Sequence, residues 1–461
     1  MSGSKPGKRI SVSPSEVHKT LENSMLVDGF PFVLDLEKSH GSWLHDSATD
    51  REYLDFFTFF ASSALGFNHP GLVEDEYLEK LGRVAVNKVS NSDLYTTEMA
   101  EFVATFRRIA VPDSLPNLFF ISGGALAVEN ALKAAFDWKV RKNFEKGLKE
   151  EKGHKVIHFR QAFHGRTGYT MSLTNTDPTK TNYFPKFDWP RIDNPKVIFP
   201  VEDHIEEIEA AEKRAVQAIE KALDKDGDDI AAIIIEPIQG EGGDNHFRRE
   251  FFAELRRIAD EREVILIFDE VQTGAGMTGR MWAHQNFGIE PDILCFGKKT
   301  QVCGIMASER INEVDSVFKV SSRINSTWGG NLVDMFRARR IFEIIEEEDL
   351  VNNAAAMGEV LLGKLRGFSE KYEGFVGNAR GLGLFCAFDL PDTACRDTFI
   401  TTTMKKGLIT LKCGPNTVRF RPPLNVSKEE IEKAAAILDE SIEEARKPVC
   451  DGDTSGAVHT E

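Results

Sequence analysis

A lysine and an aspartate each stand where a strongly apolar stretch of the sequence ends. Asp269 closes Val264–Phe268, and Lys298, 29 residues further on, closes the stretch 291–297. A charge beside buried strands costs on the order of several kcal/mol unless it meets an opposite charge, loses its proton or forms a covalent bond. One chemistry uses both residues: a lysine holds pyridoxal phosphate as a Schiff base, and an aspartate pairs with the pyridinium nitrogen of that cofactor. By local sequence alone, Lys299 is a competing nucleophile.

A glycine-rich turn offers a place for the phosphate of such a cofactor. The stretch 122–126, Ser-Gly-Gly-Ala-Leu, lies between an apolar strand pattern at 118–121 and a helical pattern that starts its apolar spacing at Val128. Small residues let a phosphate approach the backbone, and the free N–H groups and dipole of the helix favour an anion. The alternative interpretation is an ordinary helix capped by Ser122 after a glycine turn.

Two loops that follow predicted strands carry further candidate residues for the site. Phe163 can stack on a ring, and Arg166 can bind a carboxylate through two hydrogen bonds. The alternative is a loop aromatic in the core beside a surface arginine. Glu236 and Glu241 lie on a glycine-rich loop after an isoleucine-rich strand, at the sheet edge where Asp269 is expected.

Two arginines near the C-terminus alternate along a strand-like segment. Arg419 and Arg421, in Val418–Pro423, are expected on one face of that strand. They are either a solvent-exposed charge pair or a site that recognises a carboxylate, and the residues alone favour neither.

The elements that must position these residues alternate between short apolar runs and amphipathic helices, which predicts an α/β fold with a mostly parallel sheet. The carboxyl ends of parallel strands meet at one edge, where open sheets bind ligands. From about Asn331 a long charged helix runs through Glu348, followed by helices and short strands. We expect an N-terminal segment that packs with the small domain, a large α/β domain, a smaller α+β C-terminal domain and a disordered tail, at residues 1–60, 61–330, 331–447 and 448–461.

Composition restricts the partners. The net charge of −16 argues against binding of nucleic acid or an anionic membrane through bulk electrostatics. No apolar stretch approaches 18 residues, and the six cysteines lack CxxC spacing. No HExxH pattern is present, so no metal site is predicted. A cytoplasmic protein that acts on small molecules fits these properties best.

Together these segments resemble the class III aminotransferases of pyridoxal phosphate fold type I. The resemblance runs from about residue 13 to 447 and is carried by SGGALAVENALKAAF, AFHGR, EPIQGEGG, LIFDEVQTG, FGKKTQVCG, NSTWGGN and TVRFRPPL. The segment FPKFDWPRI (184–192) and the double lysine followed by TQVCG are most similar to family members that use L-lysine as amino donor. Members that use 4-aminobutyrate share features of the EPIQGEGG and double-lysine segments.

The resemblance implies the cofactor site. It selects Lys298 over Lys299 as the Schiff-base lysine and gives Asp269 the ring nitrogen. The other cofactor-binding residues that it implies are Gly124, Ala125, Phe163, Glu236, Gln272 and Thr327. Thr327 would reach the phosphate of the neighbouring subunit, so a homodimer with shared active sites is expected. Many relatives have a glutamate just after the glycine turn, where this chain has Ala125-Leu126, so any side-chain role there is lost.

The resemblance also implies a ping-pong reaction. It would move the ε-amino group of L-lysine to 2-oxoglutarate and give 2-aminoadipate 6-semialdehyde and L-glutamate, with 4-aminobutyrate or ornithine as alternative donors. The implied substrate-binding residues are Arg166, Arg419, Glu241, Gln272 and Asn325. Glu241 would neutralise Arg419 while lysine reacts and leave for 2-oxoglutarate, which places it with Lys298 and Asp269 in the catalytic set. Arg421 is expected to be structural.

Overall fold

A seven-stranded sheet organises the middle of the chain in the computed structural model, which describes residues 10–447. Its order is β3-β11-β10-β9-β6-β4-β5. Strand β11 runs antiparallel to both neighbours, and the remaining adjacent pairs are parallel. The predicted α/β fold with a mostly parallel sheet is confirmed. The strands are β3 (Asn117–Ile121), β4 (Lys155–Phe159), β5 (Arg191–Ile192), β6 (Ile230–Ile235), β9 (Ile265–Asp269), β10 (Ile293–Phe296) and β11 (Cys303–Ala307).

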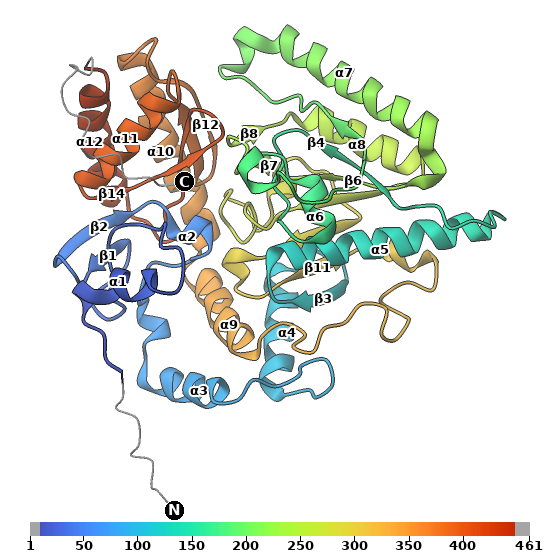
Figure 1. Cartoon of the computed structure of the whole chain (residues 1–461), viewed down its shortest axis with the longest axis horizontal. Helices are drawn as coiled ribbons and strands as arrows, with labels where there is room; N and C mark the ends of the chain where they lie inside the picture. Colours follow the sequence, from blue (N-terminus) through green and yellow to red (C-terminus); the bar gives the residue numbers. More distant parts are fainter. Residues whose placement is uncertain (1–9, 448–461) are drawn as a thin grey trace, which may run out of the picture.

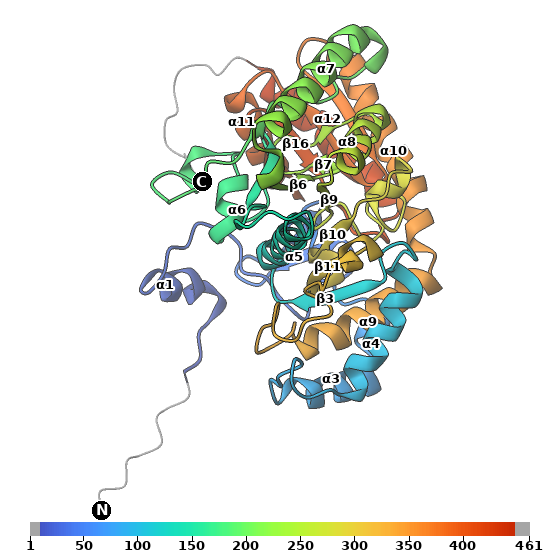
Figure 2. The same cartoon turned by 90° about the vertical axis from the view of Figure 1, so that its right-hand side faces the viewer.

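Helices cover both faces of this sheet, which explains why its central strands are continuous apolar runs (Figures 1 and 2). Helix α5 (Gly124–Glu145) packs on the face that carries Ile234 and Ile267. Helices α7 (Val201–Asp226) and α8 (Arg249–Glu261) pack on the opposite face. Successive side chains of a strand point to opposite faces, so each central strand contributes to two hydrophobic cores.

The C-terminal part of the chain builds a second layer of smaller sheets. A four-stranded antiparallel sheet has the order β12-β13-β16-β15, and a three-stranded sheet has the order β1-β2-β14. Strand β14 pairs in parallel with β2, so the N-terminal segment lies beside the C-terminal helices (Figure 1). The strands are β1 (Trp43–Asp46), β2 (Arg51–Asp55), β12 (Gly377–Leu382), β13 (Phe385–Asp389), β14 (Leu408–Ile409), β15 (Leu411–Cys413) and β16 (Thr417–Phe420).

The charged helix predicted from Asn331 through Glu348 is confirmed as α9 (Leu332–Glu347), with Asn331 at its N-cap position. The other helices are α1 (Val17–Glu22), α2 (Thr58–Ala61), α3 (Asp75–Ala85), α4 (Thr97–Ala110), α6 (Gly168–Leu173), α10 (Leu350–Lys371), α11 (Thr393–Lys405) and α12 (Lys428–Ala445). None of the helices between residues 10 and 447 combines the length and the apolar content needed to span a bilayer. The tail predicted to be disordered at 448–461 lies outside the described residues.

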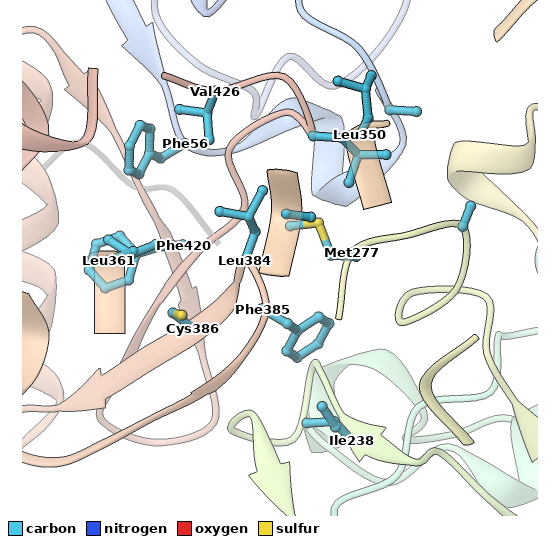
Figure 3. Packing of buried hydrophobic residues seen from close by; sticks show 14 of the residues in the cluster. Phe56, Ile238, Met277, Leu350, Leu361, Leu384, Phe385, Cys386, Phe420 and Val426 are labelled. Carbon is cyan, nitrogen blue, oxygen red and sulfur yellow. The ribbon is translucent and has the colours of Figure 1, made fainter. Parts of the chain in front are cut away.

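One hydrophobic cluster joins the large sheet to the C-terminal sheets. Figure 3 shows Phe56 from the N-terminal segment, Ile238 and Met277 from the loops of the large sheet, and Phe385 and Phe420 from the small sheet. Each of these side chains is almost completely buried. The two layers therefore share a core rather than meeting across a polar gap, which fixes the loops at the sheet edge between them.

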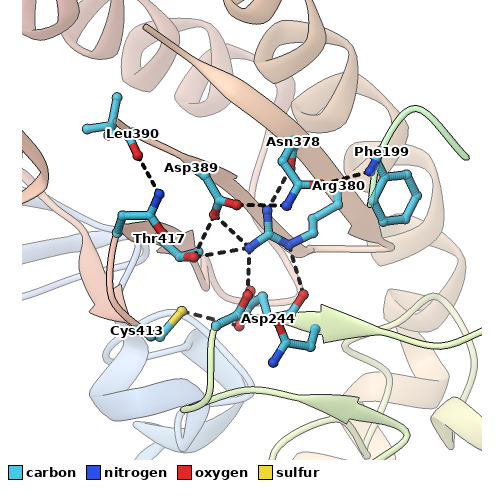
Figure 4. Close-up of polar contacts among 12 residues, drawn as sticks. Phe199, Asp244, Asn378, Arg380, Asp389, Leu390, Cys413 and Thr417 are labelled. Atoms are coloured by element: carbon cyan, nitrogen blue, oxygen red, sulfur yellow. Dashed lines mark hydrogen bonds and ion pairs between the residues drawn. The ribbon is translucent and has the colours of Figure 1, made fainter. Parts of the chain in front are cut away.

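Buried charges tie the loop after the short strand β7 (Ile238–Gln239) to the small sheet. Arg380 of β12 donates hydrogen bonds to the carbonyls of Gly243 and Asp244 over 2.6 and 2.9 Å, and pairs with Asp389 at 2.8 Å (Figure 4). In the same place Arg421 Nη2 lies 2.7 Å from Asp244 Oδ1, and both side chains are 0% exposed. The glycine-rich loop is therefore fixed by arginines of the other sheet.

Replacing Asp244 by alanine is expected to destabilise the protein by about 3–5 kcal/mol, because it leaves the buried charge of Arg421 without its anionic partner. The midpoint of urea unfolding checks this. Glu79→Ala, which removes an exposed ion pair with Arg83 on α3, is the control and should shift the midpoint far less. Equal shifts in the two variants would contradict the assigned role of the buried pair.

Candidate active site

A cavity of about 810 Å³ lies at the carboxyl edge of the large sheet. Loops of the large sheet, the N-terminal segment around Phe59–Asn68, and Arg337 of α9 line it. Most residues predicted for the site also line it: Gly124, Ala125, Phe163, Arg166, Glu236, Glu241, Asp269, Gln272 and Lys298. The parallel strands therefore bring together residues that the sequence separates widely.

The geometry of two adjacent strands places Asp269 and Lys298. Strands β9 and β10 are parallel, and Cys295 lies opposite Asp269 in their register, three residues before Lys298. Lys298 begins a tight turn that returns the chain into the antiparallel strand β11, and it has a left-handed φ of 55°. A Cβ at Gly297 would lie 2.9 Å from Cys303 Sγ and 3.3 Å from Val271 Cγ1, so there is little room for a side chain where the turn starts. The turn directs the lysine to the sheet edge.

The environments of the two neighbouring lysines differ. Lys298 lines the cavity, whereas the amine of Lys299 donates to the carbonyls of Ala61 and Gln272 over 3.1 and 2.8 Å. Burial, with Arg419 and Arg421 nearby, lowers the pKa of Lys298 to about 8. A lysine with a depressed pKa supplies a neutral, nucleophilic amine near physiological pH. Burial lowers the pKa of Lys299 as well, so it is the position in the cavity that marks Lys298 as the lysine placed for chemistry.

Asp269 has a partner that the sequence did not reveal. His164 Nδ1 lies 2.8 Å from Asp269 Oδ2, and the imidazole is fully buried. Burial alone would lower the pKa of His164, but the hydrogen bond and charge of Asp269 outweigh it and raise this pKa. The backbone N–H of Val271 donates to the other carboxylate oxygen over 3.1 Å. The histidine and this N–H together orient the carboxyl group of Asp269.

Glu236 fixes the loop that carries Phe163. Its carboxyl group accepts hydrogen bonds from the backbone N–H groups of Phe163 and Gly240, over 2.9 and 3.1 Å. Burial raises the pKa of Glu236 to about 7, with Asp269 adding to the effect. Glu236 thus positions the aromatic ring and the glycine-rich loop through the backbone.

Arg419 is buried and paired rather than solvated. Its side chain is 2% exposed, and its Nη2 lies 3.0 Å from Glu241 Oε2. The other oxygen of Glu241 lies 2.5 Å from Lys180 Nζ, a contact that the sequence did not predict. The interpretation of Arg419 and Arg421 as an exposed charge pair is wrong. Arg421 is fully enclosed between Asp244 and the ring of Phe385.

Three of the predicted residues do not line this cavity: Arg419, which is buried and contacts the lining residue Glu241, and Asn325 and Thr327. Asn325 and Thr327 are exposed on the loop between the short helix η7 (Glu309–Glu313) and α9. Arg166 is also exposed, but it lines the cavity. Neither Asn325 nor Thr327 is brought to the cofactor site of its own chain.

The residues present fit pyridoxal phosphate. Gly124 and Ala125 form the first turn of the 22-residue helix α5, where backbone N–H groups have no partner within the helix. A Cβ added at Gly123 would meet no atom within 4 Å, so open space for a phosphate lies beside that turn. An amine at Lys298, a carboxylate at Asp269 and an aromatic ring at Phe163 complete the set of groups that this cofactor needs.

The depressed pKa of Lys298 predicts how the apoprotein takes up its cofactor. Only the neutral amine attacks an aldehyde, so the attachment rate should rise about tenfold per pH unit below pH 8 and level off above it. Stopped-flow absorbance between pH 6 and 9.5 measures the rate. The same reaction with a small primary amine corrects for titration of the cofactor itself. A corrected attachment rate that keeps rising up to pH 9.5 would show that the pKa of Lys298 is that of an ordinary lysine.

This fold and site define a pyridoxal phosphate enzyme, and comparison with known proteins assigns its family. The sequence model described as "Aminotransferase class-III" matches residues 25–442, and the chain belongs to that family. It is therefore a transaminase with pyridoxal phosphate as cofactor, as the sequence predicted.

Individual relatives agree with this assignment. The chain is 54% identical over 428 residues to the L-lysine-epsilon aminotransferase of Mycobacterium tuberculosis, covering 92% of this chain and 95% of that protein. It is 31% identical over 438 residues to human mitochondrial 4-aminobutyrate aminotransferase, covering 91% and 86%. The structure of the lysine aminotransferase from M. tuberculosis in the internal aldimine form superposes with a TM-score of 0.93 at 53% identity, covering 94% of this chain and 100% of that one.

Proposed function

We propose that this enzyme transfers the ε-amino group of L-lysine to 2-oxoglutarate, giving 2-aminoadipate 6-semialdehyde and L-glutamate. The observation that carries the proposal is the pair between Glu241, which lines the cavity, and the buried Arg419. In this pair Glu241 neutralises Arg419, which is placed to bind a carboxylate next to the reacting carbon of a substrate. L-Lysine has no carboxylate next to its reacting ε-carbon. The similarity to lysine aminotransferases supports the choice of donor.

In this proposal each residue at the site has a separate role. When bound, pyridoxal phosphate supplies an aldehyde for the amino group and a ring that withdraws electrons from the reacting carbon. Asp269, oriented by His164, keeps the ring nitrogen protonated. Lys298 would hold the cofactor through its amine, and its Nζ would also serve as the base that removes a proton from the ε-carbon of the donor. The helix α5 binds the phosphate through Gly124 and Ala125.

Phe163 would stack on the ring and Gln272 would approach the ring hydroxyl, while Glu236 holds the loop of Phe163 through its backbone. Arg166 binds the carboxylate farthest from the reacting carbon in both substrates. Arg419 binds the α-carboxylate of 2-oxoglutarate once Glu241 has moved away. An unpaired arginine in this buried place would be costly while lysine reacts, so Glu241 must return in each cycle. In this proposal the two substrates react one after the other at the same site, in a ping-pong sequence.

The proposed active unit is a homodimer with the expected domain division, namely a segment 1–60, a large domain 61–330 and a small domain 331–447. Thr327, and with it Asn325, would reach the site of the neighbouring subunit, where Thr327 binds the phosphate and Asn325 the substrate. Their exposure on one loop supports this assignment. We also place the enzyme in the cytoplasm, because its buried thiols Cys295, Cys303, Cys386 and Cys413 are free.

Mixing the cofactor-loaded enzyme with L-lysine in the absence of a keto acid tests the donor. The proposal requires that lysine shift the visible cofactor absorbance to the near ultraviolet and release 2-aminoadipate 6-semialdehyde, identified by mass spectrometry. The alternative donors, 4-aminobutyrate and ornithine, would use the same catalytic residues, and the 31% identity to a 4-aminobutyrate aminotransferase favours the first of them. A shift with 4-aminobutyrate and none with lysine would overturn the choice of substrate.

A further inference from the structure

Glu241 has two cationic partners, one on each carboxylate oxygen. Oε2 lies 3.0 Å from Arg419 Nη2, and Oε1 lies 2.5 Å from Lys180 Nζ. Lys180 ends the short helix η3 (Pro178–Lys180), far in sequence from both other residues, and its ammonium lies 5.9 Å from the ring centroid of Phe163. The second partner is therefore beside the cofactor site.

We propose that Lys180 is a positioning residue that holds Glu241 when the α-carboxylate of 2-oxoglutarate displaces it from Arg419. This inference rests on the proposed exchange of Glu241 at Arg419 and deepens it. Lys180 thereby favours the second half-reaction, in which the keto acid is the substrate, without touching either substrate.

The contact geometry explains why one carboxylate can exchange partners. Breaking the bond from Arg419 to Oε2 leaves the bond from Lys180 to Oε1 in place, so the carboxylate can pivot about Lys180. Without Lys180, the displaced Glu241 would be a largely enclosed anion next to an incoming anion, which is unfavourable.

The charge state of Glu241 is consistent with this exchange. Burial raises the pKa of Glu241, but Arg419 and Lys180 outweigh burial, and the pKa lies below its ordinary value. The residue is therefore an anion at neutral pH. The side chain of Lys180 is 29% exposed, against 2% for Arg419, so Lys180 has more room than Arg419 to follow the carboxylate when Glu241 turns away from Arg419.

Lys180→Met tests the proposal, because it removes the ammonium and keeps the apolar stem. Cofactor-loaded enzyme is mixed with the amino donor alone, and amine-loaded enzyme is mixed with 2-oxoglutarate alone. The half-saturating concentration of 2-oxoglutarate should rise roughly five- to tenfold, while the donor half-reaction changes less than about twofold. Lys180→Arg should restore the wild-type value.

The double variant separates positioning from other roles. In a Glu241→Gln background, Lys180→Met should have no further effect on 2-oxoglutarate, since the anion that Lys180 holds is gone. Equal losses in both half-reactions, an unchanged response to 2-oxoglutarate, or an effect that persists with Glu241→Gln would each overturn the proposal. If lysine proves not to be the donor, the 2-oxoglutarate measurement still decides the role of Lys180, so the two failures are distinguishable.

Discussion

Replacing Lys298 by asparagine should lower kcat by about four orders of magnitude or more and abolish covalent attachment of the cofactor. In the proposed function this variant loses both the amine that binds the aldehyde and the base that moves the proton at the reacting carbon. Asparagine suits this position because φ at residue 298 is 55°, a left-handed conformation that asparagine tolerates better than alanine. The protein should therefore still fold, as circular dichroism would verify.

Borohydride reduction followed by peptide mass spectrometry locates the attachment site. In the wild type the adduct should be on Lys298, and in Lys298→Asn it should be absent. Lys299→Met is the matched control, since Lys299 donates to two backbone carbonyls and should leave the adduct on Lys298. An adduct on Lys299 in the wild type would contradict the assignment of the two lysines.

Asp269→Asn has the second-largest expected effect, a fall in kcat of about 10²–10³-fold. The change is nearly isosteric, but it removes the anion that pairs with His164 and, in the proposed function, with the ring nitrogen. Without that charge the proton on the ring nitrogen is no longer stabilised, so the ring withdraws electrons less strongly. Steady-state kinetics at saturating cofactor measures the loss.

Asp292→Asn is the control for losing a buried carboxylate at the same sheet. Asp292 pairs with Arg256 and Arg310, each at 3.1 Å, rather than with a residue of the cavity. It should lower stability while leaving kcat per bound cofactor close to the wild-type value. A kcat for Asp269→Asn within tenfold of wild type, in folded and cofactor-loaded protein, would show that the carboxylate does not act on the ring.

The sequence predicted the parts of the site that depend on strand ends. Asp269 and Lys298 each follow an apolar run, and parallel pairing brings such ends to one edge without any knowledge of side-chain contacts. The alternation of Arg419 and Arg421 correctly placed Arg419 on a strand, whereas Arg421 directly follows the end of β16, and the pattern could not show that both are buried. The partner of Arg421 is Asp244, 177 residues away in the chain, and only tertiary folding brings the two together.

The contacts that the sequence missed lie on irregular loops. His164 belongs to the segment AFHGR, where it looks like an ordinary polar residue beside an aromatic, and its partner Asp269 is 105 residues further on. Its position between Phe163 and Gly165 at the carboxyl edge of a strand was the available signal. Nothing in the sequence signalled the contact of Lys180 with Glu241. A lysine in a polar loop is most often solvated, and no periodic pattern relates the two residues.

The pairing of β14 with β2 has a consequence for how the chain folds during synthesis. Leu54 and Leu408 are partners in that ladder, and the Thr58 hydroxyl donates to the Arg421 carbonyl, 363 residues along the chain. The N-terminal segment therefore emerges from the ribosome long before the strand that completes its sheet. Until then β2 presents an unpaired edge, which makes nascent chains vulnerable to aggregation and gives folding a large non-local component. Chaperone dependence of expression should follow from this topology rather than from any weakness of the finished protein.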